Sequence, residues 1–246
     1  MIRLKSILFS VWFYAASAAL TLFGHVLAWL APASLPAYAK VWSRTVLAGL
    51  PICGITYEIL GREYLPAQGA VLIASMHQSA FDTLIWFRLV PRCRYVVKIE
   101  LMRIPLFGRL VRLSGQIAVD RAGGAATLRG LLRDGSAELA QGHQLVIFPE
   151  GTRAATGEMA PLQPGIAALA RAAGSAVLPV VTDSGFCWGR GARAKRPGII
   201  RVKIMPPIEA GLPREAMMTR LKDAFVQGSA DLAILRGAVD NSVHTP

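Results

Sequence analysis

A long uncharged stretch near the N-terminus constrains the fold of this chain more than any other feature. The 24 residues from Ile7 to Leu30 include no Asp, Glu, Lys or Arg. As a helix they would extend about 36 Å, whereas the hydrocarbon core of a bilayer is about 30 Å thick. A buried helix of a soluble protein seldom needs so long an apolar run. We therefore expect this segment to contact a membrane, in keeping with the 53% hydrophobic composition of the 246-residue chain.

The surrounding sequence leaves two membrane arrangements open. Basic residues flank the stretch on both sides, which favours keeping both ends on the cytoplasmic side. They are Arg3, Lys5, Lys40 and Arg44. A second apolar segment, Val41 to Ile59, is interrupted by two glycines and a proline, so a helical hairpin dipped into one leaflet competes with a single spanning helix. A signal peptide is less favoured, because Pro32 to Lys40 offers no convincing small-residue cleavage site.

Beyond about residue 60, short apolar runs alternate with longer segments of helical periodicity. The strand-like runs are Val71–Ser75, Tyr95–Val97, Gln116–Val119, Leu145–Phe148, Ala176–Val181 and Ile199–Met205. The helical segments are Phe81–Leu89, Ala125–Ala140, Gly165–Ala173 and about Arg214 to Gln227. This alternation predicts an α/β fold with a largely parallel or mixed sheet flanked by helices. We expect a membrane-associated helical segment over residues 1–60, the α/β domain over 61–236 and a polar tail over 237–246.

The first of these strands leads directly into a histidine and an aspartate, His77 and Asp82. Five residues of continuous α-helix turn through about 500°, which would leave the two side chains roughly 140° apart. They can meet only if His77 lies in a loop and Asp82 in the first turn of the next helix. Asp82 would then orient the imidazole as a general base. The simpler alternative is a loop histidine followed by a helix-capping aspartate.

Two further groups of polar residues follow predicted strands. Pro149-Glu150-Gly151-Thr152-Arg153 combines a flexible glycine with an arginine that can bind phosphate through two hydrogen bonds; the alternative is a turn with a surface ion pair. Lys98 and Arg121 each come at the end of a strand, and individually they could simply be solvated charges.

The formal net charge of +12 predicts anionic partners. We expect the basic tract between Asp183 and Glu209, which has no acidic residue, to face anionic lipid or an acidic carrier protein. The tract contains Arg190, Arg193, Lys195, Arg196, Arg201 and Lys203. Nucleic acid is not expected, because no binding module is recognisable. Three cysteines, Cys53, Cys93 and Cys187, lack metal-site or disulfide spacing and are expected to be reduced and mostly buried, and no metal is predicted.

Four blocks in order resemble the glycerolipid acyltransferases, and most closely the bacterial lysophosphatidate acyltransferases. The blocks are His77-Gln78-Ser79-Ala80-Phe81-Asp82, Lys98-Ile99-Glu100-Leu101 with Pro105 and Gly108, Phe148-Pro149-Glu150-Gly151-Thr152-Arg153, and Leu178-Pro179-Val180. Two positions depart from the usual pattern: Met76 stands where asparagine or lysine is frequent, and Gln163 where lysine is common.

The resemblance implies transfer of a fatty acyl group from acyl carrier protein or coenzyme A to the free hydroxyl of 1-acylglycerol-3-phosphate, giving phosphatidate. His77 would be the base and Asp82 its partner. Lys98, Arg121, Glu150, Gly151, Thr152 and Arg153 would bind the acceptor. No cofactor is implied beyond the thioester co-substrate, and the expected location is the bacterial inner membrane, with the active site facing the cytoplasm.

Three alternatives remain at this stage. The acceptor could be glycerol-3-phosphate, a lyso-ornithine lipid or another lysophospholipid. The chain could instead be a non-catalytic lipid-binding protein, although binding alone would need neither His77 nor Asp82. An acyl-enzyme formed on Ser79 is disfavoured, because the chain has no Gly-x-Ser-x-Gly turn and the acceptor hydroxyl already supplies a nucleophile.

Overall fold

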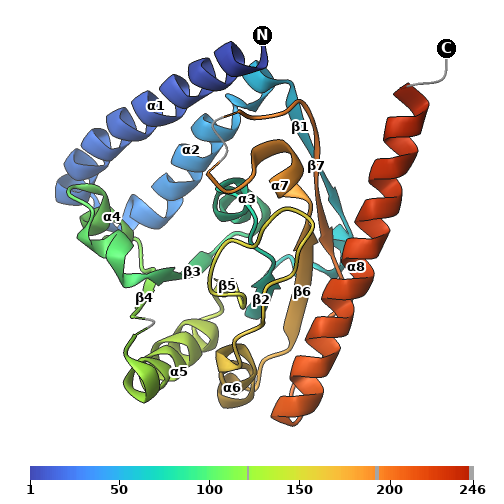
Figure 1. Ribbon diagram of the computed structural model, residues 1–246. Coiled ribbons are helices and arrows are strands. Elements are labelled where there is room, and N and C mark those ends of the chain that lie inside the picture. The colour runs from blue at the N-terminus through green and yellow to red at the C-terminus, as the bar shows by residue number, and fades with distance from the viewer. Residues whose placement is uncertain (121, 192–193, 244–246) are drawn as a thin grey trace.

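A seven-stranded mixed sheet forms the centre of the molecule, in the order β1-β7-β6-β2-β5-β3-β4 (Figure 1). The computed structural model describes residues 1–120, 122–191 and 194–243. The strands are β1 Ile55–Leu60, β2 Val71–Ser75, β3 Cys93–Lys98, β4 Ile117–Val119, β5 Gln144–Ile147, β6 Val177–Thr182 and β7 Gly198–Ile204. Strands β2 to β6 run parallel, whereas β7 is antiparallel to β6 and β1 pairs with β7. The predicted α/β class is confirmed.

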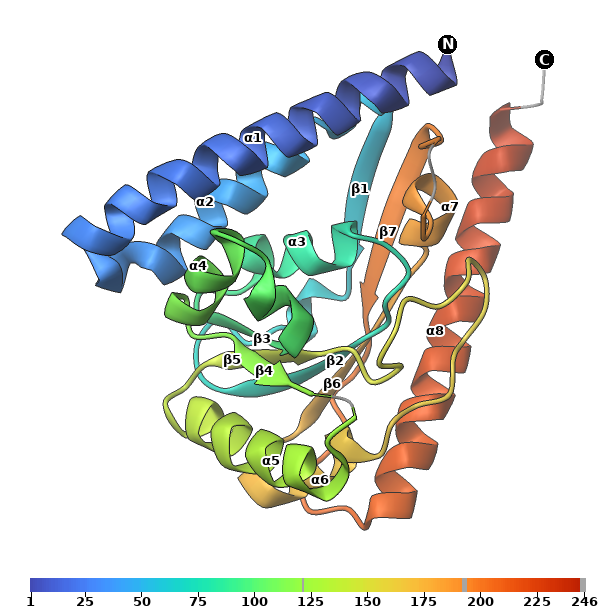
Figure 2. The ribbon, with the colours of Figure 1, turned by 60° about the vertical axis from the view of Figure 1, so that its left-hand side comes forward.

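Helices cover both faces of this sheet (Figure 2). They are α1 Ile2–Leu30, α2 Leu35–Leu47, α3 Phe81–Leu89, α4 Phe107–Leu113, α5 Gly124–Ala140, α6 Gly165–Ala173, α7 Ser184–Trp188 and α8 Arg214–Val243. Successive residues of β2 serve opposite faces, as the period of a strand requires. Ile73 joins the core that contains Trp86 of α3, and Leu72 joins the core that contains Phe225 of α8. The central strand is therefore buried on both sides.

The N-terminal helices α1 and α2 form a hairpin that lies along the α/β domain (Figure 1). Trp12 in α1 donates to the carbonyl of Thr45 in α2 at 3.0 Å. Near its start α1 is fastened to the domain by Ser6, whose hydroxyl accepts the N–H of Lys195 at 2.8 Å. Near its end, a Cβ on Gly24 would lie 2.7 Å from a methyl group of Leu110 in α4, so glycine permits this close approach. The second helix of this hairpin is α2, Leu35–Leu47, and not the Val41–Ile59 segment considered from the sequence.

Strand β1 is an element that the sequence analysis assigned wrongly. Residues 55–60 were expected to belong to an apolar membrane segment, but Ile55 to Leu60 pair in register with Gly198 to Lys203 of β7. The left-handed Gly54, with φ 69°, ends the preceding helical turn and allows the chain to enter the sheet. The run of apolar residues is thus shared between a helix and an edge strand.

Helix α8 also differs from expectation, since it continues to Val243 instead of ending near Gln227. The residue after this expected end is Gly228. In the structure it is an interior helical residue at a close crossing, where a Cβ would lie 2.7 Å from Cγ2 of Val181. The glycine serves packing of the helix on the sheet, and residues 237–243, expected to be a tail, are helical.

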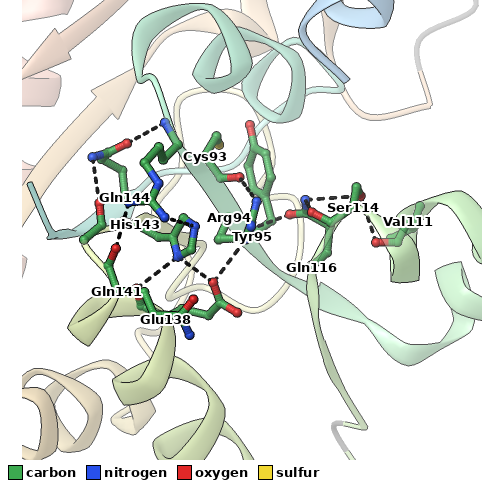
Figure 3. Close-up of polar contacts among 12 residues, drawn as sticks. Cys93, Arg94, Tyr95, Val111, Ser114, Gln116, Glu138, Gln141, His143 and Gln144 are labelled. Carbon is green, nitrogen blue, oxygen red and sulfur yellow. Dashed lines mark hydrogen bonds and ion pairs between the residues drawn. The ribbon is translucent and has the colours of Figure 1, made fainter. Parts of the chain in front are cut away.

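A polar network ties the elements together at the amino ends of β3 and β5 (Figure 3). His143 lies 2.8 Å from the carboxylate of Glu138, and Arg92 donates to the other ring nitrogen at 3.0 Å. Arg94 also binds Glu138, at 3.1 Å. Burial lowers the pKa of His143, and Arg94 lowers it further. The network joins α5 to the sheet at the edge opposite the strands' carboxyl ends.

Candidate active site

The carboxyl ends of the parallel strands gather polar side chains at one edge of the sheet. Because β2, β3, β5 and β6 are parallel, the residues that follow them share this edge. His77 comes after β2, Lys98 ends β3, Glu150 comes after β5 and Asp183 comes after β6. Edges of this kind are where α/β proteins commonly bind ligands.

His77 and Asp82 meet in the way their spacing predicts. His77 lies in the loop after β2, and Asp82 is in the first turn of α3. Nδ1 of His77 is 3.3 Å from Oδ2 of Asp82, and the imidazole stacks on Phe148 with the ring centres 4.2 Å apart. An Nδ1–H that donates to the carboxylate leaves the lone pair on Nε2. Within the described part of the chain, Nε2 has no hydrogen-bond partner, so it is available as a base.

Asp82 also holds the backbone of the loop. Its Oδ2 atom accepts the N–H groups of Gln78 and Ser79, both at 2.7 Å, and the residue is only 2% exposed. The hydroxyl of Ser79 accepts the N–H of Phe81, the first residue of α3, at 3.1 Å. The helix-capping alternative is not observed, because the N-cap residue of α3 is Ala80 and the carboxylate of Asp82 binds N–H groups of the loop before the helix.

Glu150 lies beneath this loop and is 4% exposed. Its Oε2 atom accepts the backbone N–H of His77 at 2.7 Å. Burial raises the pKa of Glu150 to about 7, the charge of Asp82 adds to this rise, and the N–H of His77 opposes it. The carboxylate is directed at the protein backbone and not at the surface.

The rest of the third block forms a turn beside His77. Gly151 has φ 69°, a conformation that favours glycine, and its N–H donates to the carbonyl of Phe148 at 2.9 Å. Ala154 donates to the carbonyl of His77 at 2.8 Å, which fastens the turn to the loop. Thr152 is exposed and Arg153 is partly exposed. Burial lowers the pKa of Arg153, and the charge of Asp82 opposes this effect.

The predicted binding residue Lys98 is not brought into this cluster by a contact with the described residues. Lys98 is exposed at the end of β3, and the described residues provide it with no ion pair. Arg121 lies outside the described residues.

Two residues of the basic tract are buried. Lys195 is 6% exposed, with its ammonium 5.2 Å from the ring centre of Phe9. Arg201 is 5% exposed and binds Glu58 at 3.3 Å. Both cations join elements of the fold. Arg193 lies outside the described residues.

Sequence reasoning missed the contacts made between blocks. The amide oxygen of Gln78 accepts the N–H of Gly185 at 3.1 Å, and Thr156 donates to the carbonyl of Gly185 at 3.0 Å. These contacts join the loop after β2, the loop after β5 and helix α7. No spacing in the sequence signals these contacts, because they depend on which strands are neighbours. All three cysteines are buried and unpaired, and the described residues include no cluster that could hold a metal ion.

Fold and site together define an α/β protein with a histidine–aspartate pair at the strands' carboxyl ends, and comparisons identify its family. The model of the Acyltransferase family matches residues 56–183. A 1-acyl-sn-glycerol-3-phosphate acyltransferase of Pseudomonas aeruginosa is 36% identical over 170 residues, 69% of this chain and 64% of the relative. The chain therefore belongs to the acyltransferase family.

Other relatives agree with this assignment. A protein of the same description from Limnanthes alba is 31% identical over 167 residues, 66% of this chain and 59% of the relative. The crystal structure of the 1-acyl-sn-glycerophosphate acyltransferase of Thermotoga maritima has the same fold, with a TM-score of 0.76 at 19% identity, covering 94% of this chain and 99% of that one. The chain spans less than two thirds of the length of the two sequence relatives, 64% and 59%.

Proposed function

We propose that the protein transfers a fatty acyl group from a thioester to the free hydroxyl of 1-acylglycerol-3-phosphate, giving phosphatidate. The observation that carries this proposal is the His77–Asp82 pair, with an unpartnered Nε2 among the described residues and the arginine of the third block close by. The names of the similar proteins support the choice of acceptor.

The geometry supports a direct transfer. Asp82 orients the imidazole through Nδ1, and Nε2 takes the proton of the acceptor hydroxyl as its oxygen attacks the thioester carbonyl. When the tetrahedral intermediate collapses, the carbon–sulfur bond breaks and the imidazolium returns the proton to the departing thiolate. A positioned base of this kind typically accelerates a reaction by about 10² to 10⁴. No acyl-enzyme is needed in this scheme.

Arg153 is the residue we assign to the acceptor's phosphate. Its guanidinium can form two parallel hydrogen bonds with a phosphate, and partial burial strengthens them. Gly151 and Thr152 shape the turn that presents it, while Lys98 and Arg121 remain candidates for additional contacts from neighbouring strand ends. Neither a cofactor nor a metal is proposed; the co-substrate is an acyl carrier protein or coenzyme A thioester.

We also propose that the hairpin rests in the cytoplasmic leaflet of the bacterial inner membrane, with the active site facing the cytoplasm. By length and composition α1 could cross a bilayer, but α2, with 13 residues, would span only about 20 Å. Because α1 contacts the α/β domain near both of its ends, through Ser6 and Gly24, it lies along the domain instead of projecting from it. Its outer face is apolar, and Tyr14 and Trp29 are 71% and 81% exposed.

An in-plane hairpin makes a topological prediction. Single cysteines placed before α1 and after α2, in a variant without the three native cysteines, should react with a membrane-impermeant reagent from the same side of oriented vesicles. Reaction from opposite sides would contradict the in-plane arrangement and support a spanning helix.

The reaction itself is tested with purified full-length protein in lipid vesicles. The assay measures phosphatidate formed from 1-acylglycerol-3-phosphate with acyl-coenzyme A or acyl carrier protein as donor. We expect wild type and His25→Ala to be active and His77→Ala to lose at least about 10²-fold, because only His77 lies in the dyad. Phosphatidate formation that survives His77→Ala would exclude the mechanism. Faster acylation of glycerol-3-phosphate or a phosphate-free lysolipid would reassign the acceptor, and no acylation of any would favour a non-catalytic lipid-binding protein.

A further inference from the structure

Two buried carboxylates hold the backbone of the loop that carries His77. Three successive N–H groups, those of residues 77, 78 and 79, point at carboxylate oxygens at 2.7 Å. Asp82 accepts the second and third, and Glu150 accepts the first. Adjacent N–H groups that converge in this way form an anion-binding concavity. Here the protein's own side chains fill it, so these N–H groups are not available to a substrate or an oxyanion.

Glu150 is poorly placed to touch a substrate. It is 4% exposed, and one of its two oxygens is committed to the N–H of His77. The other oxygen, Oε1, is buried and has no hydrogen-bond partner in the part of the chain that the structure describes. A group that bound the acceptor's phosphate would have to offer donors, whereas an ionised carboxylate offers only acceptors and would repel the phosphate. The sequence analysis placed Glu150 among the substrate-binding residues, and the geometry points elsewhere.

We infer that Glu150 is a positioning residue, which acts on the reaction proposed above by fixing the peptide group of His77. The backbone of His77 is held at three points on its two flanking peptide groups. Glu150 accepts the N–H of His77, Ala154 donates to the carbonyl of His77 at 2.8 Å, and Asp82 accepts the N–H of the next residue. On this backbone the imidazole lies against Phe148 with Nδ1 toward Asp82. A small misplacement of a catalytic group lowers the reaction rate by a large factor. Fixing the backbone of His77 is therefore expected to raise kcat.

The role requires an acceptor atom and does not require a negative charge. A glutamate that is protonated on Oε1 still accepts the N–H of His77 through Oε2. A glutamine offers the same carbonyl oxygen in nearly the same volume. An alanine offers none, and it leaves the N–H of His77 buried without a partner. The two substitutions therefore separate positioning from charge-dependent roles.

The test compares four proteins in kcat and in the KM for 1-acylglycerol-3-phosphate: wild type, Glu150→Ala, Glu150→Gln and Glu63→Ala. Glu63 is the control because it is an exposed glutamate in the turn after β1. We expect Glu150→Ala to lower kcat by roughly 10- to 100-fold with KM within about twofold, the loss associated with one hydrogen bond to a charged group. Glu150→Gln should keep at least about a third of the wild-type kcat, and Glu63→Ala should match wild type.

Other results would overturn the inference. A Glu150→Gln variant as inactive as Glu150→Ala would show that the charge is required. A tenfold rise in KM at constant kcat would show contact with the acceptor. If Glu150→Ala does not fold, as judged by its thermal transition, the comparison of Glu150→Gln with wild type decides by the same criteria. Failure of the proposed function is a separate result, since wild type itself would then form no phosphatidate.

Discussion

A single carboxylate oxygen of Asp82, Oδ2, lies 3.3 Å from Nδ1 of His77 and also accepts the N–H groups of the two residues that follow this histidine. The aspartate thus fixes both the ring and part of the backbone from which the ring projects. Asp82 thus contributes both to the loop conformation and to the tautomer of His77. Its side chain is 2% exposed and shielded from competing water. The dyad is consequently assembled before any substrate binds.

Ser79 provides a test of direct transfer. Its hydroxyl accepts the N–H of Phe81 and lies in a residue that is 1% exposed. We predict that Ser79→Ala keeps kcat within about fivefold of wild type and loses about 1 kcal/mol of stability, the usual net contribution of one hydrogen bond. Steady-state kinetics and denaturant unfolding measure the two effects. A loss of 10³-fold in kcat, with trapping of an acylated serine in wild type, would instead establish a covalent route.

Arg153 should govern affinity for the acceptor's phosphate. Arg153→Met removes both hydrogen bonds to the phosphate, and we predict a rise of roughly 10- to 100-fold in the KM for 1-acylglycerol-3-phosphate. Arg153→Lys should recover only part of the affinity for the acceptor, because an ammonium group cannot form the bidentate hydrogen bonds of a guanidinium. The KM for the thioester donor serves as the internal control. An unchanged acceptor KM in Arg153→Met would remove Arg153 from the phosphate site.

His143 predicts a pH dependence of stability away from the active site. Its pKa is lowered in the folded protein, chiefly by burial and then by Arg94, so the unfolded chain binds a proton more readily. Its contribution is therefore complete above the ordinary histidine pKa of about 6.5 and is lost as the pH falls through the lowered value. We expect the melting temperature of wild type to fall more than that of His143→Gln between pH 8 and pH 5. Equal falls in the two proteins would show that His143 is not the group responsible.

The exposed face of α1 predicts how tightly the protein binds lipid. Trp29 is 81% exposed at the end of this helix, and Trp29→Glu places a charge where the proposed hairpin meets the membrane. We predict weaker co-flotation with vesicles containing anionic lipid. Ile234→Glu is the matched control, because Ile234 is 71% exposed on α8, a helix outside the hairpin. Equal retention of both variants on vesicles would argue against the hairpin as the membrane-binding surface.

Local sequence signals predicted most of the fold but not its non-local features. Phe81–Leu89 was placed correctly because its pattern and Pro91 define a helix over a few residues. Strand β1 was missed because an apolar edge strand next to apolar helices has no distinct period. Helix α8 was cut short at Gly228, whose role is to allow contact with Val181 of a strand nearly 50 residues away. Such a role is invisible without the packing.

In the candidate site, too, the local contacts could be predicted from the sequence and the non-local contacts could not. The contact of His77 with Asp82 follows from a short spacing and one loop-to-helix junction, so the sequence was sufficient to predict it. The contact of His77 with Glu150 arises from the parallel pairing of β2 with β5, in which Ala74 lies beside Ile147. Nothing local in either segment specifies that pairing.

The most direct test of the proposed dyad is a double-mutant cycle in kcat/KM with wild type, His77→Ala, Asp82→Asn and the double variant. Asparagine keeps an oxygen for the N–H groups of Gln78 and Ser79 but removes the charge that supports the imidazolium. Residues that act as one unit give strongly non-additive losses. We predict that the double variant is within about threefold of His77→Ala alone. Losses that multiply in the double variant would contradict the account, because Asp82 would then act on the reaction independently of His77.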